Sequence, residues 1–135
     1  MSDFPVTIYH NPDCGTSRNA LAMIEAAGYI PTIIQYLQTG WTPSLLGNLL
    51  AAMQARPRAL LREKGTPATE LGLLEPGVDD ATILRAMIEY PILVDRPIVV
   101  TPLGTKLCRP SEQVLALLDR HPAGFTKEDG EAVKL

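Results

Sequence analysis

Residues 9–18 read YHNPDCGTSR, and they place a cysteine at the junction between a strand and a helix. The apolar residues at 6–9 are typical of a short strand, which the turn-forming residues 11–13 should end. Residues 20–27 carry apolar side chains at helical spacing. Cys14 is therefore expected in the first turn of a helix, or just before it.

This position favours a reactive sulfur. Free backbone N–H groups and the positive end of a helix stabilise a thiolate. Gly15, Thr16 and Ser17 leave their amides unobstructed and add two hydroxyls, so the same turn should bind an anion. The pattern predicts a nucleophile, Cys14, inside an oxyanion cradle. A buried cysteine at an ordinary helix start explains the residue types equally well.

Length and composition predict one globular domain over residues 1–135, with 46% hydrophobic and 20% charged residues. No apolar run approaches the roughly 18 residues of a membrane span. The first residues lack the features of a signal peptide, and two distant cysteines do not suggest a disulfide framework, so we expect a cytoplasmic protein.

The charge pattern excludes a broad polyanion-binding surface. The net charge is −3 and there is no dense basic run, which argues against nucleic-acid or membrane partners. An anion site must then be local, and it must depend on individual arginines. The candidates outside any basic tract are Arg58, Arg62, Arg96 and Arg109.

The middle of the chain reads as a second strand followed by helices. Residues 31–37 are rich in β-branched and aromatic side chains and predict a strand that is parallel to the first. Thr42-Pro43 should cap and begin a helix, residues 58–62 form a short one, and Asp79 or Asp80 should cap another over 81–89. We therefore expect a helical insertion over about residues 43–90.

The last third predicts a hairpin and a helix. Val99 and Val100 belong to a buried strand with Pro97 at its entrance, and residues 102–105 turn into a partner strand over 106–108. Ser111 should open a helix, and residues 125–130 could cap a short helix in the tail. The order β-α-β, helical insertion, β-β-α predicts an α/β, thioredoxin-like three-layer fold with a mixed sheet.

Several blocks of the chain closely resemble the glutaredoxin-dependent bacterial arsenate reductases. The blocks occur in the same order and cover nearly the whole chain. They are residues 8–18, 58–62, 96–105, 107–112 and 125–131.

The resemblance implies roles for individual residues. The cysteine matching Cys14 attacks arsenate, the histidine matching His10 tunes it, and a cis peptide precedes the proline matching Pro97. Arginines matching Arg62, Arg96 and Arg109 hold the oxyanion, which suits planar guanidinium groups. Arg18 and Arg58 then read as structural or long-range helpers.

The resemblance also implies the partners. Glutathione attacks the arsenate adduct, arsenic(V) is reduced to arsenic(III) as arsenite, and glutaredoxin resolves the glutathione disulfide. Glutathione is thus a co-substrate and no cofactor is bound. Cys108 matches a family cysteine, but it receives no redox role because the second sulfur comes from glutathione.

Other proteins with this layout remain alternatives. Ser17 stands where a dithiol motif has its second cysteine, which excludes an internal dithiol cycle at this motif and disfavours a thioredoxin-like regulator of RNA polymerase. A thioredoxin-like cysteine oxidoreductase with another substrate stays open. A phosphatase is disfavoured because only three residues separate Cys14 from Arg18. No cluster has zinc-ligand spacing, so no metal is predicted.

Overall fold

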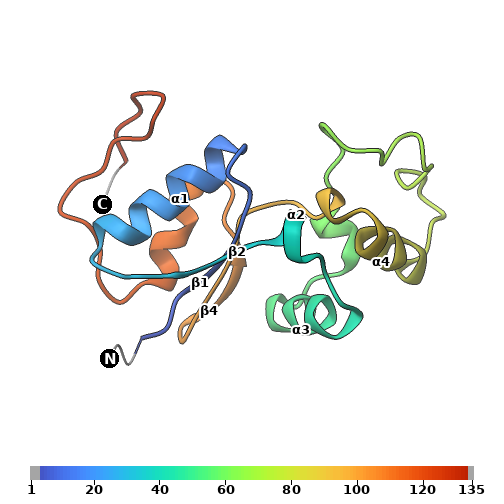
Figure 1. Ribbon diagram of the computed structural model, residues 1–135, viewed down its shortest axis with the longest axis horizontal. Coiled ribbons are helices and arrows are strands. Elements are labelled where there is room, and N and C mark those ends of the chain that lie inside the picture. Colours follow the sequence, from blue (N-terminus) through green and yellow to red (C-terminus); the bar gives the residue numbers. More distant parts are fainter. Residues whose placement is uncertain (1–3, 134–135) are drawn as a thin grey trace. The chain divides into compact units, whose positions relative to one another are not determined.

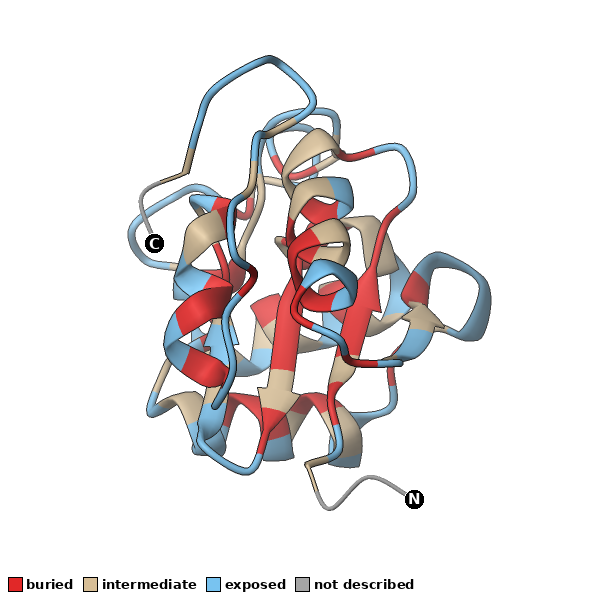
Figure 2. Ribbon diagram, turned by 90° about the vertical axis from the view of Figure 1, so that its left-hand side faces the viewer, coloured by how far each residue is buried: buried red, intermediate tan, exposed pale blue. Residues whose placement is uncertain are grey.

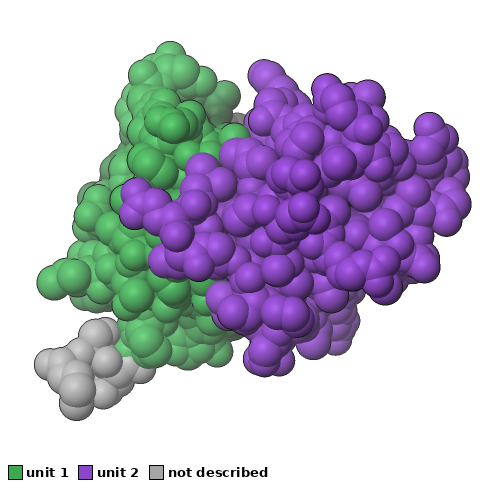
Figure 3. Space-filling view, turned by 45° about the vertical axis from the view of Figure 1, so that its right-hand side comes forward, with its two compact units in different colours: residues 1–35, 96–135 green, residues 36–95 purple. Residues whose placement is uncertain are grey.

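The computed structural model describes residues 4–133. The chain forms two compact units, shown in different colours in Figure 3. Unit 1 combines Met1–Gln35 with Arg96–Leu135, and unit 2 is Tyr36–Asp95. Unit 2 includes the whole range predicted as a helical insertion, so the chain leaves unit 1 once and returns to it once.

Unit 1 is built on a four-stranded sheet in the order β2-β1-β3-β4. The strands are β1 (Thr7–His10), β2 (Thr32–Gln35), β3 (Ile98–Thr101) and β4 (Gly104–Leu107). β1 runs parallel to β2 and antiparallel to β3, and β3 and β4 form an antiparallel hairpin. This is the predicted thioredoxin-like mixed sheet.

Two helices cover one face of this sheet (Figure 1). They are α1 (Gly15–Ala26) and the 3-10 helix η3 (Ser111–Leu117). Ile8 of β1, Val99 of β3, Ile24 of α1 and Val114 of η3 are fully buried in one apolar cluster. Burying a side chain of this size stabilises the fold by about 1.5–3 kcal/mol relative to leaving it exposed. Figure 2 shows buried residues, in red, along the strands and on parts of the helices.

Unit 2 is helical. Its elements are α2 (Tyr36–Thr39), α3 (Pro43–Met53), the 3-10 helix η1 (Pro57–Leu60), α4 (Asp80–Glu89) and the 3-10 helix η2 (Pro91–Leu93). Leu46 of α3, Leu60 of η1 and Met87 of α4 are buried, as the apolar spacing predicts. In the described part of the chain, no helix is both long and apolar enough to cross a membrane.

The second strand is shorter than predicted. It ends at Gln35, and residues 36–39 are helical instead of extended. Tyr36 is 1% exposed, its ring stacks on Trp41 at 5.0 Å between centroids, and its hydroxyl donates to the Val94 carbonyl. The β propensity of Tyr36 is thus overridden by packing inside unit 2.

Three other boundaries differ from the prediction. Residues 58–62 do not form one helix, because η1 ends at Leu60 and Leu61 forms a bridge with Val94. The second hairpin strand starts at Gly104, two residues early, and ends before Cys108. Residues 125–133 contain no helix: Thr126 forms a bridge with Ala132, and Gly130 has a φ of +96° in the turn between them.

Thr42 caps α3 as predicted: its side chain accepts the Leu45 N–H at 3.1 Å, with Pro43 in the first turn. We expect Thr42→Ala to lower the free energy of unfolding by about 0.5–2 kcal/mol, because one N–H loses its acceptor. Urea unfolding followed by circular dichroism measures the change. Thr69→Ala, in an exposed loop, is the control. Equal stabilities of the two variants would contradict a capping role.

Candidate active site

The loop between β1 and α1 fixes the backbone of Cys14. The Asn11 carbonyl accepts the Cys14 N–H at 3.0 Å, and the Asn11 side chain accepts the Asp13 N–H at 2.9 Å. Cys14 itself is extended, at φ −105° and ψ 120°, and its carbonyl accepts the Arg18 N–H at 2.9 Å to start the helix. Cys14 is therefore the residue that directly precedes α1, within the range predicted from the sequence.

Ser17 connects the cysteine to His10. The serine is fully buried, and its Oγ accepts the Asn11 N–H at 3.1 Å and lies 2.6 Å from His10 Nδ1. Its backbone N–H hydrogen-bonds the Cys14 sulfur. His10 therefore reaches the nucleophile through Ser17, which the sequence had suggested only as a hydroxyl for the anion.

Burial lowers the pKa of His10, as does the positive charge of Arg18, and Glu25 opposes them. The imidazole is then neutral at pH 7, because the ordinary histidine pKa is already about 6.5. A neutral ring next to Ser17 acts as a hydrogen-bonding partner of the serine. It adds no positive charge to the site.

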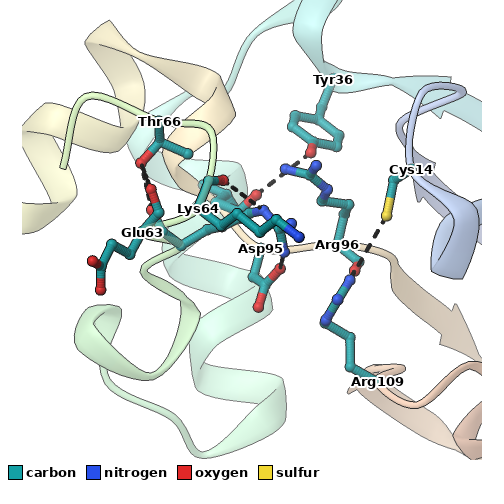
Figure 4. A network of polar contacts seen from close by, with 10 residues as sticks. Cys14, Tyr36, Glu63, Lys64, Thr66, Asp95, Arg96 and Arg109 are labelled. Atoms are coloured by element: carbon teal, nitrogen blue, oxygen red, sulfur yellow. Dashed lines mark hydrogen bonds and ion pairs between the residues drawn. The ribbon is translucent and has the colours of Figure 1, made fainter.

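Two arginines from the C-terminal half of unit 1 face Cys14. Arg96 is 9% exposed and its side chain hydrogen-bonds the sulfur. Arg109 Nη1 lies 3.7 Å from Cys14 Sγ and donates to the Arg96 carbonyl at 2.8 Å (Figure 4). The second contact fixes the guanidinium of Arg109 beside the sulfur.

These contacts determine the ionisation of the thiol. Burial raises the pKa of Cys14, but hydrogen bonds from Arg96, from the Ser17 N–H and from Arg109, together with the charge of Arg96, outweigh it. The net result is a pKa below the ordinary value for cysteine. Cys14 is thus a thiolate over a wider pH range than a free cysteine, as an attacking sulfur requires.

Pro97 lies at the entrance of β3, where the sequence placed it. The Arg96–Pro97 peptide is cis, which confirms the prediction, and the Arg109–Pro110 peptide is also cis, which was not predicted. The Pro97 carbonyl accepts the Cys108 N–H at 2.8 Å, at the open end of the hairpin formed by β3 and β4.

Arg62 belongs to unit 2. Its guanidinium pairs with Asp95 at 3.0 Å and donates to the Lys64 carbonyl at 3.1 Å. Its side chain is 15% exposed. These contacts hold the arginine within its own unit, and its predicted role toward the anion stays a prediction.

The two arginines predicted as helpers have structural contacts. Arg58 donates to the carbonyls of Leu73, Glu75 and Val78, and so closes the long loop before α4. Arg18 pairs with Glu128. This ion pair was not predicted from the sequence. It was also not predicted that Asn11 holds the loop before α1, although the turn-forming residues Asn-Pro-Asp were a signal for it.

Cys108 is fully buried, and burial raises its pKa to about 12. Its Sγ contacts the Lys106 carbonyl at 3.7 Å. Cys108 and Cys14 are both free cysteines. A thiol with this pKa is protonated at neutral pH and reacts slowly. Within residues 4–133, no three His, Cys, Asp or Glu side chains are grouped to hold a metal ion.

Known proteins resemble this chain over most of its length. Arsenate reductase ArsI1 of Synechocystis is 62% identical over 135 residues, covering 98% of this chain and 93% of that protein. An arsenate reductase of Escherichia coli K12 is 55% identical over 129 residues, covering 95% and 92%. The solved structure of an arsenate reductase from Vibrio cholerae has a TM-score of 0.81 at 38% identity, covering 87% of this chain and all of that one.

The match to a protein family includes the whole segment that carries the nucleophile and both arginines. The ArsC family matches residues 9–117, which run from the end of β1 through Cys14, Arg96 and Arg109 to the end of η3. Together with the identities above, this extent shows that the chain belongs to the ArsC family.

Proposed function

We propose that this protein reduces arsenate to arsenite, with Cys14 as the nucleophile and glutathione and glutaredoxin as the electron donors. The observation that carries the proposal is the Cys14 sulfur at the start of α1 with Arg96 and Arg109 hydrogen-bonded to it. The activity named for the relatives at 55–62% identity supports the choice of substrate.

The site suits the first step. The Cys14 thiolate forms a sulfur–arsenic bond while an arsenate oxygen, once protonated, leaves as water. Arsenic remains As(V) in this adduct. Arsenate is a tetrahedral oxyanion, and planar guanidinium groups bind paired oxyanion oxygens in a bidentate manner. The amides of Gly15 and Thr16 and the start of α1 add further donors. We assign Arg62 to the same anion on the basis of the resemblance.

The reduction needs two electrons from thiols outside this chain. Overall, arsenate and two thiols give arsenite, one disulfide and water. A glutathione thiolate attacks the Cys14 sulfur of the adduct and forms a disulfide with it. The sulfur–arsenic bond breaks, and its electron pair stays with arsenic, which leaves as As(III) in arsenite. Glutaredoxin then reduces the disulfide between Cys14 and glutathione. The fully buried Cys108, with a pKa of about 12, is a poor source of the second sulfur. The burial and the high pKa of Cys108 therefore favour a second sulfur from a thiol outside the chain.

A coupled assay tests the function. The protein is mixed with glutathione, glutaredoxin, glutathione reductase and NADPH, and NADPH oxidation is followed after arsenate is added. We expect turnover that requires all the thiol components and yields arsenite. Turnover with thioredoxin alone would overturn the choice of donor. Absence of arsenate-dependent turnover with either donor would favour the alternative, a thioredoxin-like cysteine oxidoreductase with another substrate.

A further inference from the structure

The end of the chain folds back on itself as a short strap, residues 125–133. Val133 donates its N–H to the Phe125 carbonyl at 2.9 Å, and the Thr126–Ala132 bridge follows. The Lys127 N–H donates to the Glu131 carbonyl at 2.8 Å, and the Lys127 carbonyl accepts the Gly130 N–H at 2.9 Å. The strap is thus a closed loop of backbone, although it contains no helix.

The strap is attached to both helices of unit 1. Lys127 Nζ lies 2.9 Å from a Glu112 oxygen on η3 and 2.7 Å from a Glu131 oxygen on the strap, and its side chain is only 11% exposed. The Glu128 N–H donates to the Asn19 side chain of α1 at 3.0 Å. The Glu128 backbone is therefore held beside the first turns of α1.

The side chain of Glu128 reaches the loop that carries the nucleophile. Its carboxylate accepts two hydrogen bonds from Arg18, at 2.7 and 3.0 Å, and Arg18 Nη1 donates to the Pro12 carbonyl at 2.7 Å. One carboxylate oxygen lies 3.0 Å from the position that a Cβ on Gly15 would take. A continuous set of contacts thus joins the strap to residues 12–15.

The same contacts place charge near the sulfur. Arg18 interacts electrostatically with Cys14, and its charge lowers the pKa of His10. Arg96 and Arg109, from outside α1, also act on Cys14, and Asp13 interacts electrostatically with Arg18. Glu128 is the carboxylate that pairs with Arg18, with Asp129 beside it on the strap. The negative charge of Glu128 offsets part of the positive charge of Arg18.

We propose that Glu128 is a positioning residue for Cys14: through Arg18 it holds the loop at Pro12 and sets how much positive charge the sulfur experiences. Only the expected effect of Glu128 on turnover rests on the proposed function. A loop held by one fewer contact should place the sulfur less accurately, and small misplacements of a reacting group are costly to rate. Glu128 then acts on the site from the strap through Arg18, from which it is separated by 110 positions in sequence.

The test is the pH dependence of Cys14 alkylation by iodoacetamide, read by mass spectrometry, which needs neither arsenate nor glutaredoxin. Glu128→Gln removes the negative charge and leaves Arg18 unbalanced, so the midpoint of thiolate formation should move to lower pH. Arg18→Gln removes the positive charge and should move the midpoint to higher pH. Glu128→Gln should change the midpoint much less in the Arg18→Gln variant than in the wild-type protein. The reason is that Glu128 acts through Arg18.

Glu131→Gln is the matched control. It removes the same charge from the same strap, but Lys127 keeps Glu112 as a partner and Arg18 keeps Glu128. We expect a wild-type alkylation profile. In the arsenate assay, Glu128→Gln should lower kcat about three- to tenfold with little change in KM, as expected for impaired positioning. Glu131→Gln should leave kcat unchanged.

The outcomes separate the two proposals. A Glu128→Gln profile that superimposes on the wild type, or an equal shift in Glu131→Gln, overturns the positioning role whatever the substrate is. The expected shifts in a protein that does not turn over arsenate would support the positioning role and overturn the function. Circular dichroism shows whether Glu128→Gln folds. If it does not fold, Glu128→Asp, which keeps the negative charge, replaces it in the test. A midpoint of Cys14 ionisation in Glu128→Asp that differs from the wild type would overturn the positioning role.

Discussion

Cys14→Ser should abolish arsenate-dependent NADPH oxidation in the glutaredoxin-coupled assay, a loss on the order of a thousandfold or more. The reason is the ionisation of the attacking atom. Arg96, the Ser17 N–H and Arg109 outweigh burial and lower the pKa of the Cys14 thiol, whereas a serine hydroxyl in the same place stays protonated. The change removes one sulfur atom and little volume, so circular dichroism should show an intact fold.

Cys108→Ser is the control for this experiment. Cys108 is fully buried and burial raises its pKa to about 12, so its sulfur is a protonated thiol at neutral pH. We expect a folded variant that keeps its turnover. An inactive but folded Cys108→Ser protein would point to a disulfide cycle within the chain. Turnover that survives in Cys14→Ser would remove Cys14 from the mechanism.

Arg109→Gln should reduce kcat/KM for arsenate by about a hundred- to a thousandfold, the range found when one preorganised donor to a developing oxyanion is removed. Arg109 is held by the Arg96 carbonyl at 2.8 Å and lies 3.7 Å from the Cys14 sulfur. Glutamine keeps a polar side chain but loses the charge and the paired donors. The variant should therefore bind the anion more weakly and keep less of the Cys14 sulfur as thiolate.

The pH profile shows which of these effects operates. Arg109 favours the thiolate, so its removal should raise the pKa of Cys14 and move the acid limb of kcat/KM to higher pH. Raising the pH should then recover part of the loss, and the remainder measures the lost contact with the anion. Arg85→Gln, an exposed arginine on α4, is the control. An unchanged acid limb in Arg109→Gln would show that this arginine does not act on the sulfur.

Local sequence patterns predicted most of the elements. The strand, turn and helix around Cys14, the Thr42 cap of α3 and the Asp79 cap of α4 depend on residues a few positions apart, and all three are observed. Two errors have different causes. Tyr36 is helical because it is buried within unit 2, where its hydroxyl donates to the carbonyl of Val94, 58 residues away. The tail turns at Gly130 because residues 126 and 132 pair, a short-range contact that the residue pattern did not indicate.

The sequence by itself determined where the nucleophile stands. Asn11 and Cys14 are close in the chain, so the turn and the helix start follow from short-range geometry and hydrogen bonds. The tertiary structure alone decided what surrounds it. Arg109 is 95 residues from Cys14, and only the pairing of β1 with β3 in one sheet brings its half of unit 1 to the sulfur. No local pattern encodes that contact, because its energy depends on groups that are adjacent only after the sheet has formed.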